Sequence, residues 1–541
     1  KLRGACVHHD NGVIGAATIA RADERRVEML KEAGFNALRS SHNPMSPAML
    51  DACDRLGMLV MDEAYDTWTI SKSSFDHAAD FSQWWEREIE AMVRKDVNHP
   101  SVVIYSIGNE IPEVGSGLGS LWGRRLAEKI RSLDDTRFIT NGVNGLVAVM
   151  DEVRAMAAER MEDSESMGVN ALMANIGEMM NQLGSSELVT GRTAESFAVL
   201  DIAGMNYLDA RYEMDRELFP HRIIVGSETF PPHIDVNWGL VKRNSHVIGD
   251  FTWTGWDYLG EVGVGRTIYA DDPAGAGFMA PFPWLTAWVG DIDITGHRRP
   301  ASYYREIVFG LRNEPYIAVQ RPSGFGRQVV SGPWSWSDSV SSWTWNGSEG
   351  APIRVEVYSD ADEVELLLNG ESIGRAPAGE QHRFRADFDT TYQTGELLAI
   401  AFTNGREQGR HRLVTATGPV RLAIEADRTE MRADSADLAF ISIALTDAEG
   451  TLYTDSDRLV TVGITGPGAL QGFGSARPET LERFTDTTHT TFGGRALAVI
   501  RPTRPGEVTV TVSAPGCESS AVTIRSVAGE EIRRRHDQPG R

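Results

Sequence analysis

Cysteine is scarce in this sequence: Cys6, Cys53 and Cys517 are the only thiols in 541 residues. An odd number of widely spaced cysteines forms neither a disulfide framework nor a zinc site. We therefore expect these side chains to behave as small hydrophobic residues buried in a core.

Positive charge is also in short supply. Lys and Arg number 53 against 76 for Asp and Glu, which gives a net charge of −23. A surface this acidic argues against nucleic acid and against an anionic membrane as partners. No run of about 18 apolar residues occurs, so no segment is expected to span a membrane. This composition suits a neutral substrate such as a sugar.

The chain begins at Lys1 in strand-like sequence, without an initiator methionine or a signal peptide. We expect that an N-terminal part of the protein is missing. The compartment is left open between cytoplasmic and periplasmic or secreted.

A chain of this length exceeds what one hydrophobic core holds, so about three or four domains are expected. Over residues 1–312, short apolar runs alternate with amphipathic stretches, a pattern typical of parallel β-strands separated by helices. The eight apolar runs are Leu2–His8, Asn36–Arg39, Met58–Asp62, Val102–Ser106, Arg137–Asn141, Asp201–Asn206, Arg222–Gly226 and Asp250–Trp253. Helical patterns lie at Ala22–Ala33, Pro47–Leu56, Gln83–Val97, Leu121–Ser132 and Leu240–Val247. Eight such repeats predict a (β/α)₈ TIM barrel, a fold in which catalysis lies at the C-terminal ends of the strands.

The remaining segments differ from the barrel region in composition and residue pattern. Residues 150–196 are rich in Met, Glu and Ala and are too long for a simple connection, so they predict a helical insertion in the barrel. Short alternating strands with Asn-Gly turns predict an Ig-like β-sandwich over residues 334–416 and a second, C-terminal one over residues 420–527. The charged end, residues 528–541, is predicted to be a disordered tail.

Two of the predicted strands end in a glutamate. "VVIYSIGNEI" ends in Asn109-Glu110-Ile111, and "RIIVGSETF" carries Glu228 near its end. In a barrel both glutamates would lie at the mouth, where burial and neighbours shift the pKa of a carboxyl group. Glycoside hydrolysis needs two such carboxyl groups, one on each face of the anomeric carbon. The alternative is that each glutamate only caps a following helix.

The same residues resemble a known family. Asn109-Glu110 after "SIG" and Glu228 after "VGS" resemble the signature pair of glycoside hydrolase family 2, which includes β-galactosidases, β-glucuronidases and β-mannosidases. Further segments resemble strands of that family's barrel, in order: "RGACVHHD" (3–10), "NALRSSHNP" (36–44), "GMLVMDEA" (57–64), "AGMNY" (203–207) and "DFTWTGWDYLGE" (250–261). The resemblance implies a retaining exo-β-glycosidase.

The resemblance also implies roles for single residues. Glu110 corresponds to the general acid/base and Glu228 to the nucleophile. Asn109 corresponds to the residue that hydrogen-bonds the sugar 2-hydroxyl. Tyr207 and Arg39 correspond to residues beside the nucleophile, and both are expected to keep it ionised, because a donor or a cation lowers the pKa of a carboxyl group.

Three further residues match the sugar subsite of the family. His8 and His42 correspond to histidines that line it, and Trp253 corresponds to the tryptophan that forms its apolar floor. His42 precedes the turn signal Asn43-Pro44, so it could instead only cap that loop. Residues for which an ordinary core, loop or packing role is left open are His9, Asp62, Glu63, Trp256, Trp284 and Trp288.

No metal or organic cofactor is expected. Some β-galactosidases of the family hold Mg²⁺ through an acidic loop with a histidine after the third strand. Here that loop reads "DEAYDTW" (62–68) and has no histidine, so no metal site is carried over.

The two sandwiches resemble modules that follow the barrel in bacterial members of the family. From the resemblance, this chain is expected to lack the jelly-roll and the Ig-like domain that precede the barrel in the family. Because the jelly-roll reaches the active site in relatives, we expect this chain alone to lack part of the sugar subsite. Homo-oligomer formation is left open.

The substrate is predicted from a recognition motif that this sequence lacks. The β-glucuronidases of the family recognise the uronic carboxylate through an Asn-x-Lys motif after the eighth strand, and residues 261–304 contain no lysine. The leading prediction is therefore a β-galactosidase that acts on terminal non-reducing β-D-galactosyl residues. The alternatives are a β-glucuronidase or other β-glycosidase of the family, and a non-catalytic carbohydrate-binding relative. Retention of Arg39, Asn109 and Tyr207 beside both glutamates favours an enzyme.

Overall fold

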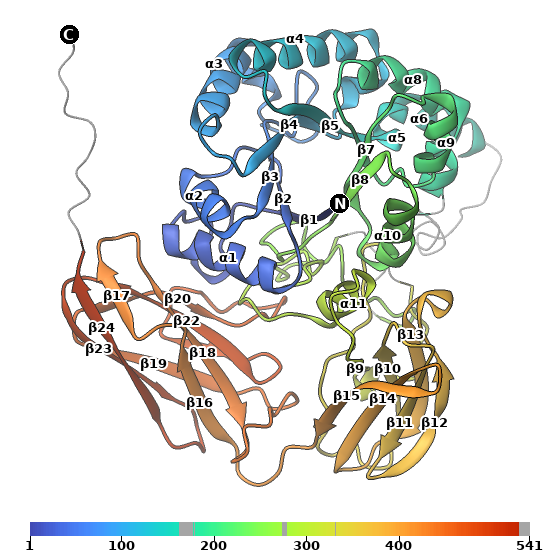
Figure 1. Ribbon diagram of the computed structural model, residues 1–541. Coiled ribbons are helices and arrows are strands. Elements are labelled where there is room, and N and C mark those ends of the chain that lie inside the picture. Colours follow the sequence, from blue (N-terminus) through green and yellow to red (C-terminus); the bar gives the residue numbers. More distant parts are fainter. Residues whose placement is uncertain (162–176, 178, 273–278, 331, 530–541) are drawn as a thin grey trace.

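The computed structural model describes residues 1–161, 177, 179–272, 279–330 and 332–529. Eight parallel strands close into a barrel in chain order, with β1 hydrogen-bonded to β8 (Figure 1). Their bounds are β1 Leu2–Val7, β2 Ala37–Ser40, β3 Leu59–Glu63, β4 Val102–Asn109, β5 Phe138–Asn144, β6 Ala203–Asn206, β7 Ile224–Thr229 and β8 Val247–Thr252. The predicted (β/α)₈ barrel is confirmed.

Helices cover the outside of the barrel. They are α1 Ala20–Glu32, α2 Pro47–Leu56, α3 Ala78–Asp96, α4 Gly117–Leu133, α5 Gly145–Ala148, α6 Met150–Met161, α8 Glu187–Ala198, α9 Arg211–Leu218, α10 Ile234–Arg243 and α11 Pro300–Val308. Helix α2 shows how the sequence sets such bounds. Ser46 accepts a hydrogen bond from the Met49 N–H, Pro47 occupies the first turn, and Gly57 follows in the left-handed conformation at φ 72°.

One predicted helix is wrong in its bounds. The pattern at Leu240–Val247 predicts a helix, but α10 ends at Arg243 and Val247 already begins β8. Asn244 is extended and donates its side-chain amide to the Leu240 carbonyl, which ends the helix. The β-branched pair Val247-Ile248 then continues as a strand, as β-branched residues favour.

The helical insertion predicted over residues 150–196 is described only in part. Helix α6 precedes residues 162–176 and 178, which lie outside the described residues, and α8 follows them.

Two all-β units follow the barrel, as predicted. The first has a sheet of order β13-β10-β9 and a sheet of order β12-β11-β14-β15; the second has sheets of order β16-β18-β22-β20 and β17-β24-β23-β19-β21. The strands of the first are β9 Tyr316–Val319, β10 Pro352–Tyr358, β11 Glu363–Leu368, β12 Glu371–Pro377, β13 Arg385–Thr391, β14 Glu396–Thr403 and β15 Arg406–Val414. Those of the second are β16 Arg421–Ala426, β17 Glu430–Ala433, β18 Ala439–Thr446, β19 Leu459–Thr465, β20 Gly468–Gly474, β21 Thr488–Thr490, β22 Arg495–Pro502, β23 Gly506–Ser513 and β24 Ser520–Ala528.

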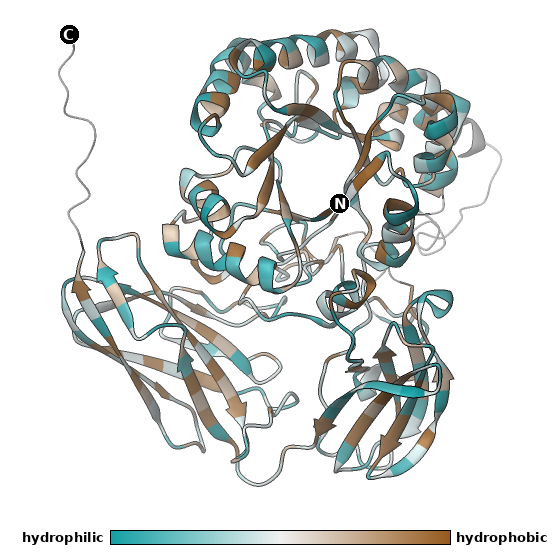
Figure 2. Ribbon diagram, viewed as in Figure 1, coloured by the Kyte–Doolittle hydropathy of each residue, from teal (hydrophilic) through white to brown (hydrophobic). Residues whose placement is uncertain are grey.

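Each sandwich has its own apolar core, and hydrophobic and polar residues are interspersed along its strands (Figure 2). Strand β9 pairs with β10 although it lies upstream of the range 334–416 predicted for the first sandwich. Strand β24 reaches Ala528, and the rest of the predicted tail, from residue 530, lies outside the described residues. Cys6 and Cys53 are buried and Cys517 is half-buried, and all three thiols are free.

Both sandwiches contact the barrel. Arg383 of the first sandwich forms an ion pair with Asp235 of α10 at 2.7 Å. Arg21 of α1 pairs with Asp427 at 2.9 Å, and the Leu285 N–H donates to the Pro478 carbonyl at 2.8 Å, so the second sandwich contacts both α1 and the segment between β8 and α11. No helix in the described part of the chain has the length and apolar character needed to cross a membrane.

Candidate active site

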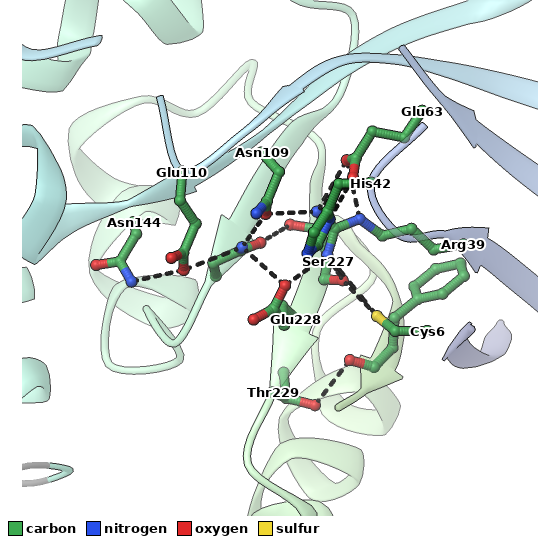
Figure 3. A network of polar contacts seen from close by, with 12 residues as sticks. Cys6, Arg39, His42, Glu63, Asn109, Glu110, Asn144, Ser227, Glu228 and Thr229 are labelled. Atoms are coloured by element: carbon green, nitrogen blue, oxygen red, sulfur yellow. Dashed lines mark hydrogen bonds and ion pairs between the residues drawn. The ribbon is translucent and has the colours of Figure 1, made fainter. Parts of the chain in front are cut away.

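The predicted site residues gather at the C-terminal ends of the barrel strands (Figure 3). Arg39 lies in β2, Glu228 lies in β7, and Glu110 and Tyr207 directly follow β4 and β6. Glu110 and Tyr207 have positive φ angles of 47° and 56°. A left-handed backbone is uncommon for such residues and clusters at functional sites.

Glu228 is buried and held by three donors. Its Oε2 accepts from Arg39 Nη1 at 2.9 Å and from Asn206 Nδ2 at 3.2 Å, and its Oε1 accepts from the Tyr207 hydroxyl at 2.6 Å. Burial and the charge of Glu110 raise the pKa of Glu228 to about 7, although Arg39 and Tyr207 act in the opposite direction. Arg39 and Tyr207 therefore favour ionisation of Glu228, as expected, but burial outweighs them.

Glu110 faces Glu228 across the mouth and is less buried. Its Oε1 accepts from Asn144 Nδ2 at 2.7 Å and from Asn206 Nδ2 at 3.3 Å. Because Asn206 Nδ2 is 3.3 Å from Glu110 Oε1 and 3.2 Å from Glu228 Oε2, those two oxygens lie no more than 6.5 Å apart. One amide group thus joins the two carboxyl groups.

Glu63 is a central residue that the sequence leaves undecided. It is fully buried at the end of β3 and accepts from Arg39 Nε and Nη2 at 3.0 and 2.8 Å and from the Ser106 hydroxyl at 2.7 Å. His42 Nδ1 lies 2.7 Å from its other oxygen. Burial opposes ionisation of Glu63, but Arg39 and His42 outweigh it and hold its pKa below the usual value. Glu63 therefore fixes both Arg39 and His42.

Asp62 has a different surrounding from its neighbour Glu63. Its oxygens accept from the Met45 N–H at 2.8 Å and from Lys95 Nζ at 3.1 Å. Asp62 therefore holds the β2–α2 loop and α3 in place, and it makes no contact in the network around Glu228.

Asn109 lies between Arg39 and the loop after β3. Its Oδ1 accepts from Arg39 Nη2 at 2.8 Å and from Asn206 Nδ2 at 2.9 Å, and its Nδ2 donates to Asp66 at 2.9 Å. Lys72 Nζ contacts both Asp66 Oδ1 at 2.7 Å and the Asn109 carbonyl at 2.8 Å.

His8, His42 and Trp253 form an aromatic cluster at the barrel mouth. The His42 ring is parallel to Trp253 with centroids 5.2 Å apart, and His8 meets Trp253 edge-on at 5.3 Å. A pocket of about 930 Å³ is lined by His8, His42 and Asp66 among others. His9 also lines this pocket, and its Nε2 lies 2.8 Å from the Asn43 carbonyl, which fits the loop role left open for it.

A residue from the loop between β9 and β10 of the first sandwich contacts Tyr207, the hydrogen-bond donor to Glu228. Trp334 Nε1 donates to the Tyr207 hydroxyl at 2.8 Å, while that hydroxyl donates to Glu228. Cys6 lies on the other side, with Sγ 3.4 Å from the Ser227 carbonyl and 3.7 Å from Arg39 Nη1.

The structure thus joins six of the predicted residues in one polar network and adds two by ring contacts. The six are Arg39, His42, Asn109, Glu110, Tyr207 and Glu228; the two are His8 and Trp253. Sequence reasoning missed Asn144, Asn206 and Trp334. Asn144 and Asn206 could have been suspected from the sequence, since both are polar residues at the C-terminal ends of barrel strands. The three tryptophans left open lie elsewhere: Trp256 in the barrel core, and Trp284 and Trp288 near the second sandwich.

Among the described residues, one group has the spacing of metal ligands: Asp51, Asp54 and His99. His99 Nδ1 already lies 2.7 Å from Asp54 Oδ2, and the group is part of neither the glutamate network nor the pocket beside it.

Comparison with known families matches three segments of the chain. Residues 1–183 match the TIM-barrel domain of glycosyl hydrolases family 2, and residues 422–523 match the family 2 C-terminal domain 5. Residues 350–409 match a domain of unknown function, DUF4982.

Individual relatives match almost the whole chain. A β-galactosidase of Bacteroides ovatus is 27% identical over 97% of this chain and 61% of its own length. A putative β-glucuronidase of Formosa agariphila is 25% identical over 86% of this chain and 42% of its own length. A crystal structure of a glycosyl hydrolase family 2 member from Bacteroides cellulosilyticus superposes with a TM-score of 0.83 at 35% identity, over 97% of this chain and 62% of that one.

This chain therefore spans about three-fifths of the length of the B. ovatus and B. cellulosilyticus relatives. The matched barrel model contains Glu110 and its strand, and the C-terminal model coincides with the second sandwich. With the barrel domain, a C-terminal domain and the paired glutamates in place, the chain belongs to glycoside hydrolase family 2.

Proposed function

We propose that this protein is a retaining exo-β-glycosidase that releases terminal non-reducing β-D-galactosyl residues. The observation that carries the proposal is the pair Glu110 and Glu228, which project from two strand ends and are joined through Asn206 Nδ2. Their Oε1 and Oε2 oxygens are at most 6.5 Å apart, a limit set by the contacts of 3.3 and 3.2 Å to that nitrogen. Retaining glycosidases have carboxyl groups about 5–5.5 Å apart, and inverting enzymes about 6.5–9.5 Å.

In the first step, Glu228 attacks the anomeric carbon and forms a glycosyl ester. The bond to the leaving oxygen breaks, and Glu110 gives its proton to that oxygen. In the second step, Glu110 takes a proton from water, the water oxygen attacks the anomeric carbon, and Glu228 leaves as a carboxylate. Each residue ends in the protonation state in which it began.

The neighbouring residues support these steps. Arg39 and Tyr207 stabilise the carboxylate form of Glu228 before attack and when it leaves. Asn109 is placed to bond the sugar 2-hydroxyl, a contact that strengthens toward the transition state. His8, His42 and Trp253 form the wall on which the sugar ring packs.

A galactoside is favoured over a glucuronide by the charges at the mouth. Lys72 lies beside Asn109, but its ammonium group is paired with Asp66 at 2.7 Å and offers no unpaired cation to a uronate. The segment 261–304 contains no lysine. The B. ovatus relative is named a β-galactosidase, whereas the F. agariphila relative is named a putative β-glucuronidase.

The test is a panel of 4-nitrophenyl glycosides, with the anomeric configuration of the first product followed by proton NMR. We expect the highest kcat/KM for the β-galactoside and a β-configured first product. A higher kcat/KM for the β-glucuronide would overturn the substrate, and an α-configured first product would overturn the mechanism.

A further inference from the structure

A second cavity lies where the barrel and the two sandwiches meet, and none of its residues belongs to the glutamate network. It encloses about 250 Å³. Its walls come from the segment between β8 and α11, from the segment around β9, and from the loop before β22. The backbone bridges Trp284–Glu479 and Tyr269–Val329 hold these segments together.

The charge of this cavity is opposite to that of the molecule. Five arginines and two aspartates line it, in a chain whose net charge is −23. Both aspartates are engaged by local donors. Asp338 Oδ2 accepts from the Tyr269 hydroxyl at 2.5 Å, and Asp293 Oδ1 accepts from the Thr295 N–H and hydroxyl at 2.8 and 2.7 Å.

The five arginines differ in their partners, and Arg266 donates to the Gly263 carbonyl at 2.8 Å. Arg298 pairs with Glu306 at 3.0 Å, and Arg299 donates to the carbonyls of Trp288 and Gly290. Within the described residues, by contrast, the guanidinium groups of Arg321 and Arg495 make neither an ion pair nor a hydrogen bond.

Arg321 and Arg495 are largely enclosed by protein. Burial lowers the pKa of both guanidinium groups, although the charges of Asp338 and Asp457 act in the opposite direction on Arg321, and that of Asp293 on Arg495. Burial and the charge of Arg495 also lower the pKa of His297, on the same wall, to about 4. A partly buried cation without a direct ion pair or hydrogen bond is costly, so its presence beside a cavity indicates a ligand that supplies the negative charge.

Aromatic rings complete the walls. Arg321 lies 5.8 Å from the centroid of Phe492, and Trp288 meets Phe492 edge-on at 5.8 Å. Trp284 lines the same space. Guanidinium groups match the geometry of carboxylate, phosphate and sulfate, and aromatic faces suit the C–H face of a sugar ring.

We infer that this cavity is a binding site for a small oxyanion, with Arg321 and Arg495 as its principal ligands. Its volume lies just below the usual range of small-molecule pockets, about 300–1,000 Å³, so it admits a single anion or one acidic monosaccharide. The shared chemistry is the oxyanion, and it is supplied either by a free inorganic ion or by a sugar acid.

The test is isothermal titration calorimetry of the whole chain with sodium phosphate, galacturonate and galactose, at an ionic strength held constant with sodium chloride. We expect saturable binding of phosphate or galacturonate. Phosphate alone would identify a bare oxyanion site, and galacturonate alone would identify a sugar-acid site. Phosphate binding should be unchanged in Glu228→Gln, because the cavity is separate from the proposed active site.

The double variant Arg321→Gln/Arg495→Gln should weaken this binding at least about tenfold, since hydrogen bonds to charged groups are among the strongest in proteins. The matched control is Arg354→Gln/Arg410→Gln, which removes the same charge from two exposed, paired arginines of the first sandwich. It should bind like the wild type. Equal affinity in both double variants, or no saturable heat for phosphate and galacturonate, would overturn the inference.

Thermal unfolding gives a second readout. A ligand that binds the folded state raises the unfolding temperature. Phosphate or galacturonate should raise it in the wild type but not in Arg321→Gln/Arg495→Gln. Without ligand, that variant should be at least as stable as the wild type, because two partly buried charges without a direct partner are removed. A ligand-free variant that is strongly destabilised would instead assign the two arginines a structural role.

Discussion

The Tyr207 hydroxyl links Glu228 to Trp334, which lies 127 positions further along the chain than Tyr207. It donates to Glu228 at 2.6 Å and accepts from Trp334 at 2.8 Å. A donor to an ionised carboxylate is worth about 1.5–3 kcal/mol, so its loss matters most where Glu228 must be ionised.

We predict that Tyr207→Phe lowers kcat/KM about 10- to 100-fold at pH 7. In the proposed mechanism Glu228 attacks only as a carboxylate, so activity of the free enzyme should fall as pH drops through its pKa, which is about 7. Loss of the Tyr207 donor removes a contribution that lowers this pKa, and the acidic limb of the kcat/KM profile should move to higher pH. Trp334→Phe should move it in the same direction but less, and should add nothing in the Tyr207→Phe background. An acidic limb that stays in place in Tyr207→Phe would contradict this role.

The two glutamates should give distinct phenotypes. We predict that Glu228→Gln abolishes turnover even of activated aryl glycosides, because no nucleophile remains. Glu110→Gln should still glycosylate on substrates with good leaving groups, which need little acid assistance, and azide should accelerate its second step. Both are measured by stopped-flow and steady-state assays with dinitrophenyl glycosides. Interchanged phenotypes would mean that the roles are reversed.

At the scale of elements, strand β3 fastens β2 and β4 at the mouth. Glu63 receives hydrogen bonds from Arg39 of β2 and from Ser106 of β4. Removal of one partner from a buried ion pair costs about 3–5 kcal/mol, because the other charge is left without compensation.

We therefore predict that Glu63→Gln lowers the unfolding temperature and also lowers the kcat of the protein that remains folded. Arg39 and His42 would lose the carboxylate that orients them. Asp62→Asn is the matched control, since Asp62 is the preceding, equally buried residue and pairs with Lys95. It should lower stability but leave kcat of the folded protein nearly unchanged. Equal losses of kcat in both variants would show that Glu63 acts only through stability.

Much of the barrel could be predicted at this scale, because each strand is a short apolar run followed by a polar residue. The exceptions have local causes. The α10–β8 connection is three residues long, so its helix and strand patterns merge in the sequence. Strand β9 is four residues long and lies beyond the barrel, and its pairing with β10 spans a long loop. Glu63 could not be assigned, because its role depends on side chains from β2 and β4.

At the scale of the whole molecule, residues that are distant in the sequence complete the site. Their part in the site could not be predicted from the sequence alone. Trp334 lies in a Ser/Trp-rich segment with no strand or helix pattern, and only its contact with Tyr207 identifies it. Asn206 could have been suspected because it lies at a strand end. Its contacts with both glutamates could not have been predicted. The proximity of Glu110 and Glu228 could be predicted, because the motifs around them are specific, and their catalytic roles stay predictions.

We also predict that activity does not depend on a metal ion. Two carboxyl groups suffice for acid/base and covalent catalysis at an acetal, although oxygen-rich loops such as 62–66 do bind Mg²⁺ or Ca²⁺ in other proteins. The protein would be treated with EDTA and assayed with and without added Mg²⁺. A loss of about tenfold or more, equivalent to about 1.4 kcal/mol of barrier, that Mg²⁺ restores would show a functional ion.

The assignment of Glu228 as nucleophile is tested most directly by trapping the glycosyl-enzyme. The protein is incubated with an activated 2-deoxy-2-fluoro-β-D-galactoside, digested, and analysed by mass spectrometry. The geometry predicts one fluorosugar per chain, on the peptide that contains Glu228, and none in Glu228→Gln. A label on Glu110, or turnover to an α-configured product without any label, would contradict a double displacement through Glu228.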